Sequence, residues 1–288
     1  MKEITIISGK GGTGKTTFTA NLASLLDNLV LGDCDVDAPN LHLLLNPVNK
    51  SKEIYKGAKL AVKNQWICID CGKCYDHCRY NAITVNDFEV KKLKCEGCGV
   101  CVEVCPTKAL KLEAVATGNI YQAESQFGDM VHARLFPGAD TSGKLVSEVK
   151  KKTAEIAKKK EKDWILIDGS PGIGCPVIAS LNGSDLAILV TEPTLSGFSD
   201  LKRVVEVVKH FKIQAALVIN KYDLNKEISE KIISYSQKED IQFLTKIPYS
   251  KVIVDSLKRG EFFVDNDQDL RQKMIKVKRY LTTKMGVI

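Results

Sequence analysis

Short apolar runs alternate with longer amphipathic stretches over most of this chain. The apolar runs predict strands at residues 3–8, 29–33, 164–168, 186–191, 215–220 and 242–247. The stretches between them carry apolar residues at helical spacing, and they predict helices over 15–27, 142–160, 173–182, 197–211, 226–238 and 268–284. Strands that alternate with helices in this way indicate an α/β fold, in which a mostly parallel sheet has helices on both faces.

Residues 58–114 interrupt this alternation and hold eight of the ten cysteines. The eight form two runs with the same C-x2-C-x2-C-x3-C spacing, and each cysteine of the second run lies 27 residues after its counterpart in the first. The runs are Cys68, Cys71, Cys74 and Cys78, and then Cys95, Cys98, Cys101 and Cys105. We therefore predict an inserted domain over 58–114, within a larger domain made of 1–57 and 115–288.

The duplicated spacing is typical of the bacterial two-cluster ferredoxins, in which the fourth cysteine of each run binds the other cluster. The resemblance predicts an α+β ferredoxin-like domain with two [4Fe-4S] clusters. One cluster would be held by Cys68, Cys71, Cys74 and Cys105, and the other by Cys95, Cys98, Cys101 and Cys78. The alternative is a pair of zinc knuckles, although zinc sites usually take their ligands as two separated pairs. One departure from the pattern is Arg79, which follows Cys78 where a proline is usual.

A phosphate-binding motif follows the first predicted strand. Residues 9–16 read G-K-G-G-T-G-K-T and open the first predicted helix. Backbone N–H groups of such a loop surround phosphates at a helix N-terminus, so we expect ATP or ADP here. In such a loop Lys15 reaches the β- and γ-phosphates, and Thr16 binds Mg²⁺. The expected nucleotide-binding residues are Gly9, Lys10, Gly11, Gly12, Thr13, Gly14, Lys15, Thr16 and Thr17.

The lysine at the second position of the motif, Lys10, makes the loop resemble the deviant Walker A group of P-loop ATPases. This group, of the SIMIBI class, includes MinD, ParA and the nitrogenase iron protein. Its second-position lysine reaches the nucleotide of a partner subunit. The resemblance therefore implies a nucleotide-dependent dimer, made of two copies of this chain or of this chain and a related ATPase.

Other segments resemble the same group in the expected order. The sequence D-C-D-V-D at 33–37 is similar to its first switch, and the resemblance places Asp35 on the attacking water, with Asp33 and Asp37 close enough to serve. The strand that ends in Asp168 looks like a Walker B motif, with Asp168 on a water bound to Mg²⁺. The resemblance also implies that Asn220 reads the adenine edge and that the loop at Pro248 flanks the base. Lys10, Lys15 and Asp35 are the expected catalytic residues.

Together these motifs predict a cytoplasmic, oxygen-sensitive ATPase that couples a nucleotide switch to electron transfer through two [4Fe-4S] clusters. It would serve redox delivery or metallocluster maturation, with an unidentified redox or metallocluster protein as partner. Two alternatives stay open. One is an iron–sulfur assembly or carrier ATPase of the Mrp type, although no cysteine follows Cys175 to supply the C-terminal pair that such scaffolds use. The other is a positioning ATPase like MinD, which would need a membrane anchor.

Composition and charge narrow the possible partners. The net charge is +7, and much of the surplus lies in lysine clusters at 150–152 and 158–160, which we expect to be solvated helix surface and not a nucleic-acid site. No apolar run approaches the roughly 18 residues of a membrane-spanning helix, and we expect no signal peptide. An apolar stripe in the tail is expected to pack on its own domain: Leu270, Met274, Val277 and Leu281. Cys34 and Cys175 receive no role.

Overall fold

The computed structural model describes residues 1–140 and 142–286, which form two compact units. The sheet unit contains residues 1–53, 120–134 and the chain from Ser142 onward. The cysteine unit contains residues 54–119 together with 135–140.

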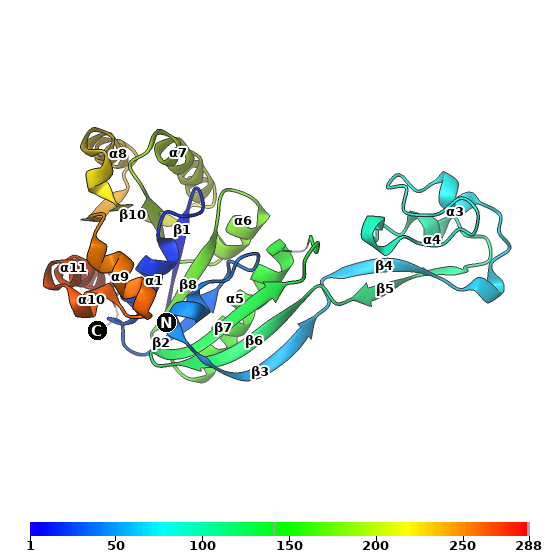
Figure 1. The fold of residues 1–288 in the computed structure, drawn as a ribbon, viewed down its shortest axis with the longest axis horizontal. Coiled ribbons are helices and arrows are strands. Elements are labelled where there is room, and N and C mark those ends of the chain that lie inside the picture. Colours follow the sequence, from blue (N-terminus) through cyan, green and yellow to red (C-terminus); the bar gives the residue numbers. More distant parts are fainter. Residues whose placement is uncertain (141, 287–288) are drawn as a thin grey trace. The chain divides into compact units, whose positions relative to one another are not determined.

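A large sheet forms the centre of the sheet unit (Figure 1). Within the described residues its strand order is β11-β10-β9-β1-β8-β2-β7-β6-β3, and every pairing from β11 to β7 is parallel. The strands are β1 (Lys2–Ser8), β2 (Leu29–Asp33), β3 (Val48–Tyr55), β6 (Gly118–Ser125), β7 (Gly128–Leu135), β8 (Trp164–Pro171), β9 (Leu186–Thr191), β10 (Gln214–Asn220) and β11 (Gln242–Ile247).

Helices cover both faces of this sheet, because its central strands are apolar on both sides. In β1, Ile4 and Ile6 face the core beneath α1, α10 and α11, whereas Ile7 faces the core beneath α6, α7 and α8. The predicted α/β fold is thus confirmed. The helices of the unit are α1 (Lys15–Ala23), α2 (Leu41–Leu45), α5 (Ser142–Lys159), α6 (Cys175–Leu181), α7 (Leu195–His210), α8 (Lys226–Lys238), α9 (Lys251–Arg259), α10 (Phe263–Asn266) and α11 (Gln268–Met285).

The tail helix α11 packs on its own domain, as its stripe predicts. Leu270, Met274, Val277 and Leu281 are each at most 2% exposed and belong to the core that also contains Ile4 and Ile6. Among the described residues, no helix combines the length and the apolar character that crossing a membrane requires.

Strands β3, β6 and β7 extend the sheet beyond the strands that the sequence predicts. β3 reads V-N-K-S-K-E-I-Y, and all its residues except Tyr55 are exposed. β6 and β7 follow each other across a turn at 126–127 and have no helix between them. The prediction depended on buried apolar runs that alternate with helices. The exposed β3 and the directly connected β6 and β7 do not follow that pattern, so they were not predicted.

The cysteine unit repeats one local structure twice. Its two longer strands, β4 (Ala58–Lys63) and β5 (Leu110–Val115), pair antiparallel. Two short helices, α3 (Lys73–Asp76) and α4 (Val100–Glu103), each begin after a glycine in the left-handed conformation, with φ of 76° at Gly72 and 83° at Gly99. A side chain would be strained at that φ, so both glycines are required for the turns. The two turns lie 27 residues apart, like the cysteine runs.

Two stacked histidines lie at the edge of the sheet unit. The ring of His132 in β7 stacks on His42 of α2 with centroids 5.1 Å apart, and on Tyr121 of β6 with centroids 4.8 Å apart. Burial, together with the charge of His42, lowers the pKa of His132 from 6.5 to about 4. His132 is 6% exposed, so its protonation opposes folding.

This stack makes stability dependent on pH. Because the folded-state pKa of His132 lies below its unfolded value, stability is complete above about pH 6.5 and is lost progressively as pH falls toward 4. Between about pH 7 and pH 5 we expect a loss of about 2 kcal/mol from this residue. Urea unfolding of the full chain and of His132→Phe at both pH values measures it. Carboxylates contribute equally to the pH dependence of both proteins, so they cancel when the two losses of unfolding free energy are compared. An equal loss in both proteins would therefore contradict the prediction.

Candidate functional site

The loop between β1 and α1 forms one end of a cavity of about 490 Å³ in the sheet unit, a size that suits a nucleotide. Two of its glycines require positive φ, 78° at Gly12 and 88° at Gly14, and a Cβ at Gly14 would lie 2.2 Å from the Asn220 amide nitrogen. Ten of the predicted site residues line the cavity: Gly11, Gly12, Thr13, Gly14, Lys15, Thr16, Thr17, Asp35, Asn220 and Pro248.

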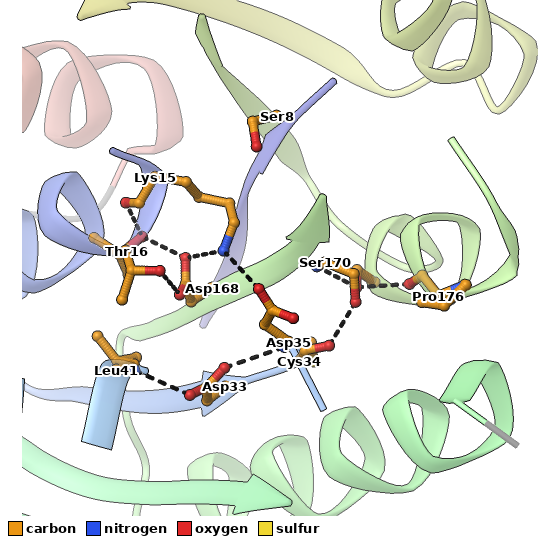
Figure 2. A network of polar contacts seen from close by, with 12 residues as sticks. Ser8, Lys15, Thr16, Asp33, Cys34, Asp35, Leu41, Asp168, Ser170 and Pro176 are labelled. Carbon is orange, nitrogen blue, oxygen red and sulfur yellow. Dashed lines mark hydrogen bonds and ion pairs between the residues drawn. The ribbon is translucent and has the colours of Figure 1, made fainter. Parts of the chain in front are cut away.

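A fully buried carboxylate, Asp168 at the centre of β8, organises the base of this cavity (Figure 2). The Lys15 ammonium donates to it at 2.9 Å, and the hydroxyls of Thr16 and Thr19 donate at 2.7 and 3.0 Å. Burial alone would lower the pKa of Lys15, but the ion pair and hydrogen bond with Asp168, together with the charges of Asp35 and Asp33, outweigh burial and raise it. Lys15 is therefore a charged, buried cation at the point where phosphates would enter.

The three aspartates of the 33–37 segment occupy different environments. Asp35 lines the cavity, and its carboxylate lies 4.0 Å from the Lys15 ammonium. Asp33 is fully buried and accepts hydrogen bonds from the backbone N–H groups of Asp35 at 3.1 Å and Leu41 at 3.2 Å, which Figure 2 shows. Asp37 is exposed and does not line the cavity. The geometry thus groups Asp33 and Asp35 with Lys15.

Burial changes the acidity of these carboxyls. It raises the pKa of Asp35, against the opposing effect of Lys15. Burial and the neighbouring charge of Asp168 also raise the pKa of Asp33. A carboxyl with a raised pKa is better suited to accept a proton near neutral pH, so the environment of Asp35 fits a base.

Lys10 does not line the cavity but is held by a second loop of its own chain. Its ammonium lies 2.7 Å from the Glu192 carboxylate and donates to the hydroxyls of Thr194 at 3.2 Å and Ser196 at 3.0 Å. Glu192 also pairs with Lys221 at 3.0 Å, and Lys221 donates to the Gly12 carbonyl. Glu192 was not among the residues predicted for the site.

The opposite wall of the cavity is apolar and suits a base. Tyr249 and Pro248 lie on it, and the Tyr249 N–H donates to Asp223 at 2.7 Å, which fixes this loop. The Asn220 amide nitrogen donates to the Thr13 carbonyl at 2.8 Å, so it also holds the phosphate loop. The sequence analysis missed the apolar residues that α2 and α9 contribute: Leu43, Leu44, Ile253, Val254 and Leu257.

In the cysteine unit, each of two small cavities is lined by four thiols. One is lined by Cys68, Cys71, Cys74 and Cys105. The other is lined by Cys78, Cys95, Cys98 and Cys101. Each cavity thus takes three cysteines from one run and the fourth from the other run.

Backbone N–H groups point at several of these sulfurs. The N–H of Ala82 donates to the Cys78 sulfur at 3.4 Å, and the N–H of Ala109 donates to the Cys105 sulfur at 3.2 Å. These two bonds are equivalent in the repeat. Burial and the neighbouring thiolates, led by Cys95, raise the pKa of Cys101 to about 11. Within residues 1–140 and 142–286, no three His, Cys, Asp or Glu side chains are placed to hold a metal ion.

The other two cysteines lie in the sheet unit and line neither four-thiol cavity. Cys34 is fully buried, burial raises the pKa of its thiol, and its carbonyl accepts from the Ser170 hydroxyl at 2.6 Å. Cys175 is exposed at the start of α6.

A glycine-rich loop between a parallel strand and a helix, with a buried lysine and a strand aspartate behind it, defines a P-loop nucleotide-binding protein. The chain belongs to the family described as the CobQ/CobB/MinD/ParA nucleotide binding domain, which matches residues 4–263. The MinD and ParA members of this family are ATPases.

Several known proteins are similar to this chain. Two uncharacterized proteins of Methanocaldococcus jannaschii, MJ0578 and MJ0579, are 37% identical over 78% of this chain and 80% of the relative, and 30% identical over 98% of both. The MinD structure of Pyrococcus horikoshii, complexed with Mg-ADP, is 23% identical over 99% of this chain and 98% of that one, with a TM-score of 0.60.

Two shorter matches come from proteins whose names indicate redox complexes. A component of the ion-translocating oxidoreductase complex of Methanosarcina acetivorans is 35% identical over 26% of this chain and 27% of its own. The PorD component of the pyruvate synthase of Methanothermobacter marburgensis is 44% identical over 16% of this chain and 56% of its own.

Proposed function

We propose that this chain is an ATP-binding and ATP-hydrolysing iron–sulfur protein, in which a nucleotide switch controls electron transfer through two [4Fe-4S] clusters. Redox delivery or metallocluster maturation would be its role. The observation that carries this proposal is the presence, in one chain, of a P-loop site and two cavities that each have four thiols. The partial similarity to a component of an oxidoreductase complex supports the redox part.

The donor set of each cavity suits a cluster better than a zinc ion. A zinc site usually takes its four ligands as two separated pairs, whereas each cavity takes three cysteines from one run and the fourth from the other. Four thiolates around an enclosed space are the ligands of a [4Fe-4S] cluster, which when bound supplies one-electron storage at low potential. The chain would hold it with those thiolates and tune it with N–H donors such as Ala82 and Ala109.

The residues of the nucleotide cavity suit phosphoryl transfer to water by positioning and charge. Lys15 would meet the phosphates, and Thr16 and Asp168 would hold Mg²⁺, because their oxygens already meet at 2.7 Å. Asp35 would orient the attacking water and accept its proton. Loss of the γ-phosphate would release the 35–40 segment, as in other nucleotide switches.

The 33–41 segment is connected along the chain to the cysteine unit. Asp33 holds the N–H of Leu41 at the start of α2, and β3 begins three residues after α2 ends. β3 then continues to Tyr55, which belongs to the cysteine unit. A change in the 33–41 segment would therefore act on the strand that enters the cysteine unit.

We further propose that Lys10 acts across a nucleotide-dependent dimer. Lys10→Ala is expected to leave ATP affinity within about threefold, because this side chain does not line the cavity, and to lower hydrolysis by about 100-fold or more, as for other charges supplied in trans. Nucleotide titration and phosphate release measure both effects. Glu192→Gln is the control: it removes the ion pair that holds Lys10 in its own chain and should retain hydrolysis. Loss of affinity equal to that of Lys15→Ala would contradict the trans role.

An anaerobic EPR redox titration tests the coupling. We expect MgATP or MgADP to shift the potential of at least one cluster by about 30 mV or more, which is about 0.7 kcal/mol for one electron. Lys15→Ala, in which nucleotide binding is expected to fail, should show no shift. Identical curves without nucleotide, with MgATP and with MgADP would overturn coupling at the level of potential.

A further inference from the structure

Two repeat-related turns carry the most exposed large apolar side chains among the described residues. Trp66 is 95% exposed and Leu93 is 102% exposed, and they lie 27 residues apart. Each occupies the middle of a one-turn 3₁₀ helix, Gln65–Ile67 or Lys92–Lys94, which ends immediately before the first cysteine of a run. Each apolar side chain therefore lies two residues before a cysteine that lines a four-thiol cavity, Cys68 or Cys95.

The two turns differ sharply in charge. The residues that flank Trp66 are Gln65 and Ile67, whereas the Leu93 turn is Lys91-Lys92-Leu93-Lys94. All four residues of that second turn are exposed. In the described part of the chain, none of its three lysine side chains takes part in a salt bridge or a hydrogen bond, although Lys63 of the same unit pairs with Glu89. The three lysines beside Cys95 therefore have no ion pair among the described residues, and the carboxylate nearest to Cys95 in the sequence is that of the exposed Glu96.

An exposed leucine surrounded by three lysines without ion pairs combines an apolar contact with a charged, solvent-accessible rim. Such a surface fits a partner with an apolar recess surrounded by carboxylates, because complementary charge speeds encounter and fixes orientation. Its position next to Cys95 matters as well, since electron transfer slows steeply with distance. Polyanions such as nucleic acid or anionic lipid would also bind the lysines, but only an electron carrier needs to dock next to a cluster ligand, and Leu93 lies two residues before Cys95.

We propose that Lys91, Lys92, Leu93 and Lys94 form the docking surface for an acidic electron-carrier protein. This inference rests on the proposed iron–sulfur function. One electron passes from the reduced carrier to the oxidised cluster held by Cys95, Cys98, Cys101 and Cys78, so the carrier is oxidised and the cluster reduced by one electron, with no bond made or broken.

Anaerobic stopped-flow reduction of the full, cluster-loaded chain tests this docking surface. The probe is a reduced, small, acidic two-[4Fe-4S] ferredoxin. The test variant is Lys91→Glu/Lys92→Glu/Lys94→Glu. The matched control, Lys151→Glu/Lys158→Glu/Lys159→Glu, makes the same change of charge at exposed α5 lysines that have no ion pair among the described residues. We expect the test variant to lower the bimolecular rate constant by about tenfold or more at low ionic strength, and the control by less than about threefold.

Two further measurements separate charge from apolar anchoring. The wild-type rate should fall as ionic strength rises from about 20 to about 300 mM, and the test variant should lose this dependence. Leu93→Ala should slow reduction at both ionic strengths, because its effect does not depend on charge. The variant Lys91→Gln/Lys92→Gln/Lys94→Gln only removes charge, and its rate constant should lie between those of the wild type and the glutamate variant. The test therefore does not depend on whether the fold tolerates three glutamates.

The outcomes distinguish this inference from the proposed function. Iron content and EPR spectra are recorded first for every protein. A wild-type chain without clusters overturns both proposals. A chain whose clusters accept electrons from dithionite, but whose reduction by ferredoxin is absent or equally affected in test and control variants, overturns the docking surface alone. Loss of binding to duplex DNA or to phosphatidylglycerol vesicles in the test variant, with an unchanged ferredoxin rate, also overturns it.

Discussion

Lys15→Ala is expected to abolish tight ATP binding and to lower hydrolysis by at least about 100-fold. Its ammonium lies 2.9 Å from Asp168 and 4.0 Å from Asp35, at the base of the cavity. Without it, phosphates would meet the carboxylates of Asp33, Asp35 and Asp168 with no lysine between them. An anaerobic titration with a fluorescent ATP analogue and a phosphate-release assay measure the two effects.

Nucleotide binding by Lys15→Ala can also be followed through the unfolding temperature, which does not depend on hydrolysis. MgADP should raise the unfolding temperature of the wild-type chain, because a ligand that binds only the folded state stabilises it. It should leave the unfolding temperature of Lys15→Ala unchanged. Lys15→Gln provides a second variant that keeps most of the side-chain volume, and it should behave in the same way. Wild-type affinity in both variants would show that this cavity is not the nucleotide site.

Two double cysteine variants should differ in how much iron they retain. Cys68→Ser/Cys105→Ser removes two thiols from one cavity, so the chain should keep about four of about eight irons. Cys68→Ser/Cys78→Ser removes one thiol from each cavity and should lose nearly all of them. The pairs are matched, because each removes two thiols and shares Cys68. Iron and sulfide analysis with EPR spectra of anaerobically purified protein measures the difference.

This comparison also tests the crossover itself. If each run held its own cluster, Cys68 and Cys78 would belong to the same site, and the two pairs would exchange their results. Equal loss in both pairs would show that the two sites do not assemble independently. The single variant Cys105→Ser should weaken the cluster that contains Cys68 and spare the one that contains Cys95.

The parts of the fold that the sequence predicts are those with strong periodic patterns. The central strands are buried on both faces, so their residues are mostly apolar and these short apolar runs predict strands directly. The expected start of α1 at residue 15 agrees with the structure, although the helix ends at Ala23 and not at 27. The edge strand β3 escaped prediction because its polar residues are stabilised by pairing with a neighbour and not by their own burial pattern.

The candidate site divides in a similar way. The phosphate loop is a contiguous motif, so spacing alone brings its residues together. The fourth thiol of each cysteine cavity comes from the other run, and this grouping was predicted from the resemblance to two-cluster ferredoxins and not from spacing within a run. The contact between Lys10 and Glu192 joins residues 182 positions apart, and no local pattern reports such a pair. The apolar wall from α9 was equally hidden, because Ile253 and Leu257 at helical spacing resemble any core-facing stripe.

The bond between Lys15 and Asp168 has a consequence for which form of nucleotide can enter. While they are paired, these two charges neutralise each other, so the cavity offers no bare positive charge to a passing anion. A phosphate that draws Lys15 away leaves a fully buried carboxylate without its cation, unless a divalent ion arrives in the same step. Entry of a nucleotide together with its divalent ion would replace the Lys15–Asp168 pair by a Lys15–phosphate pair and an Asp168–metal interaction, so we expect metal-free nucleotide to bind more weakly.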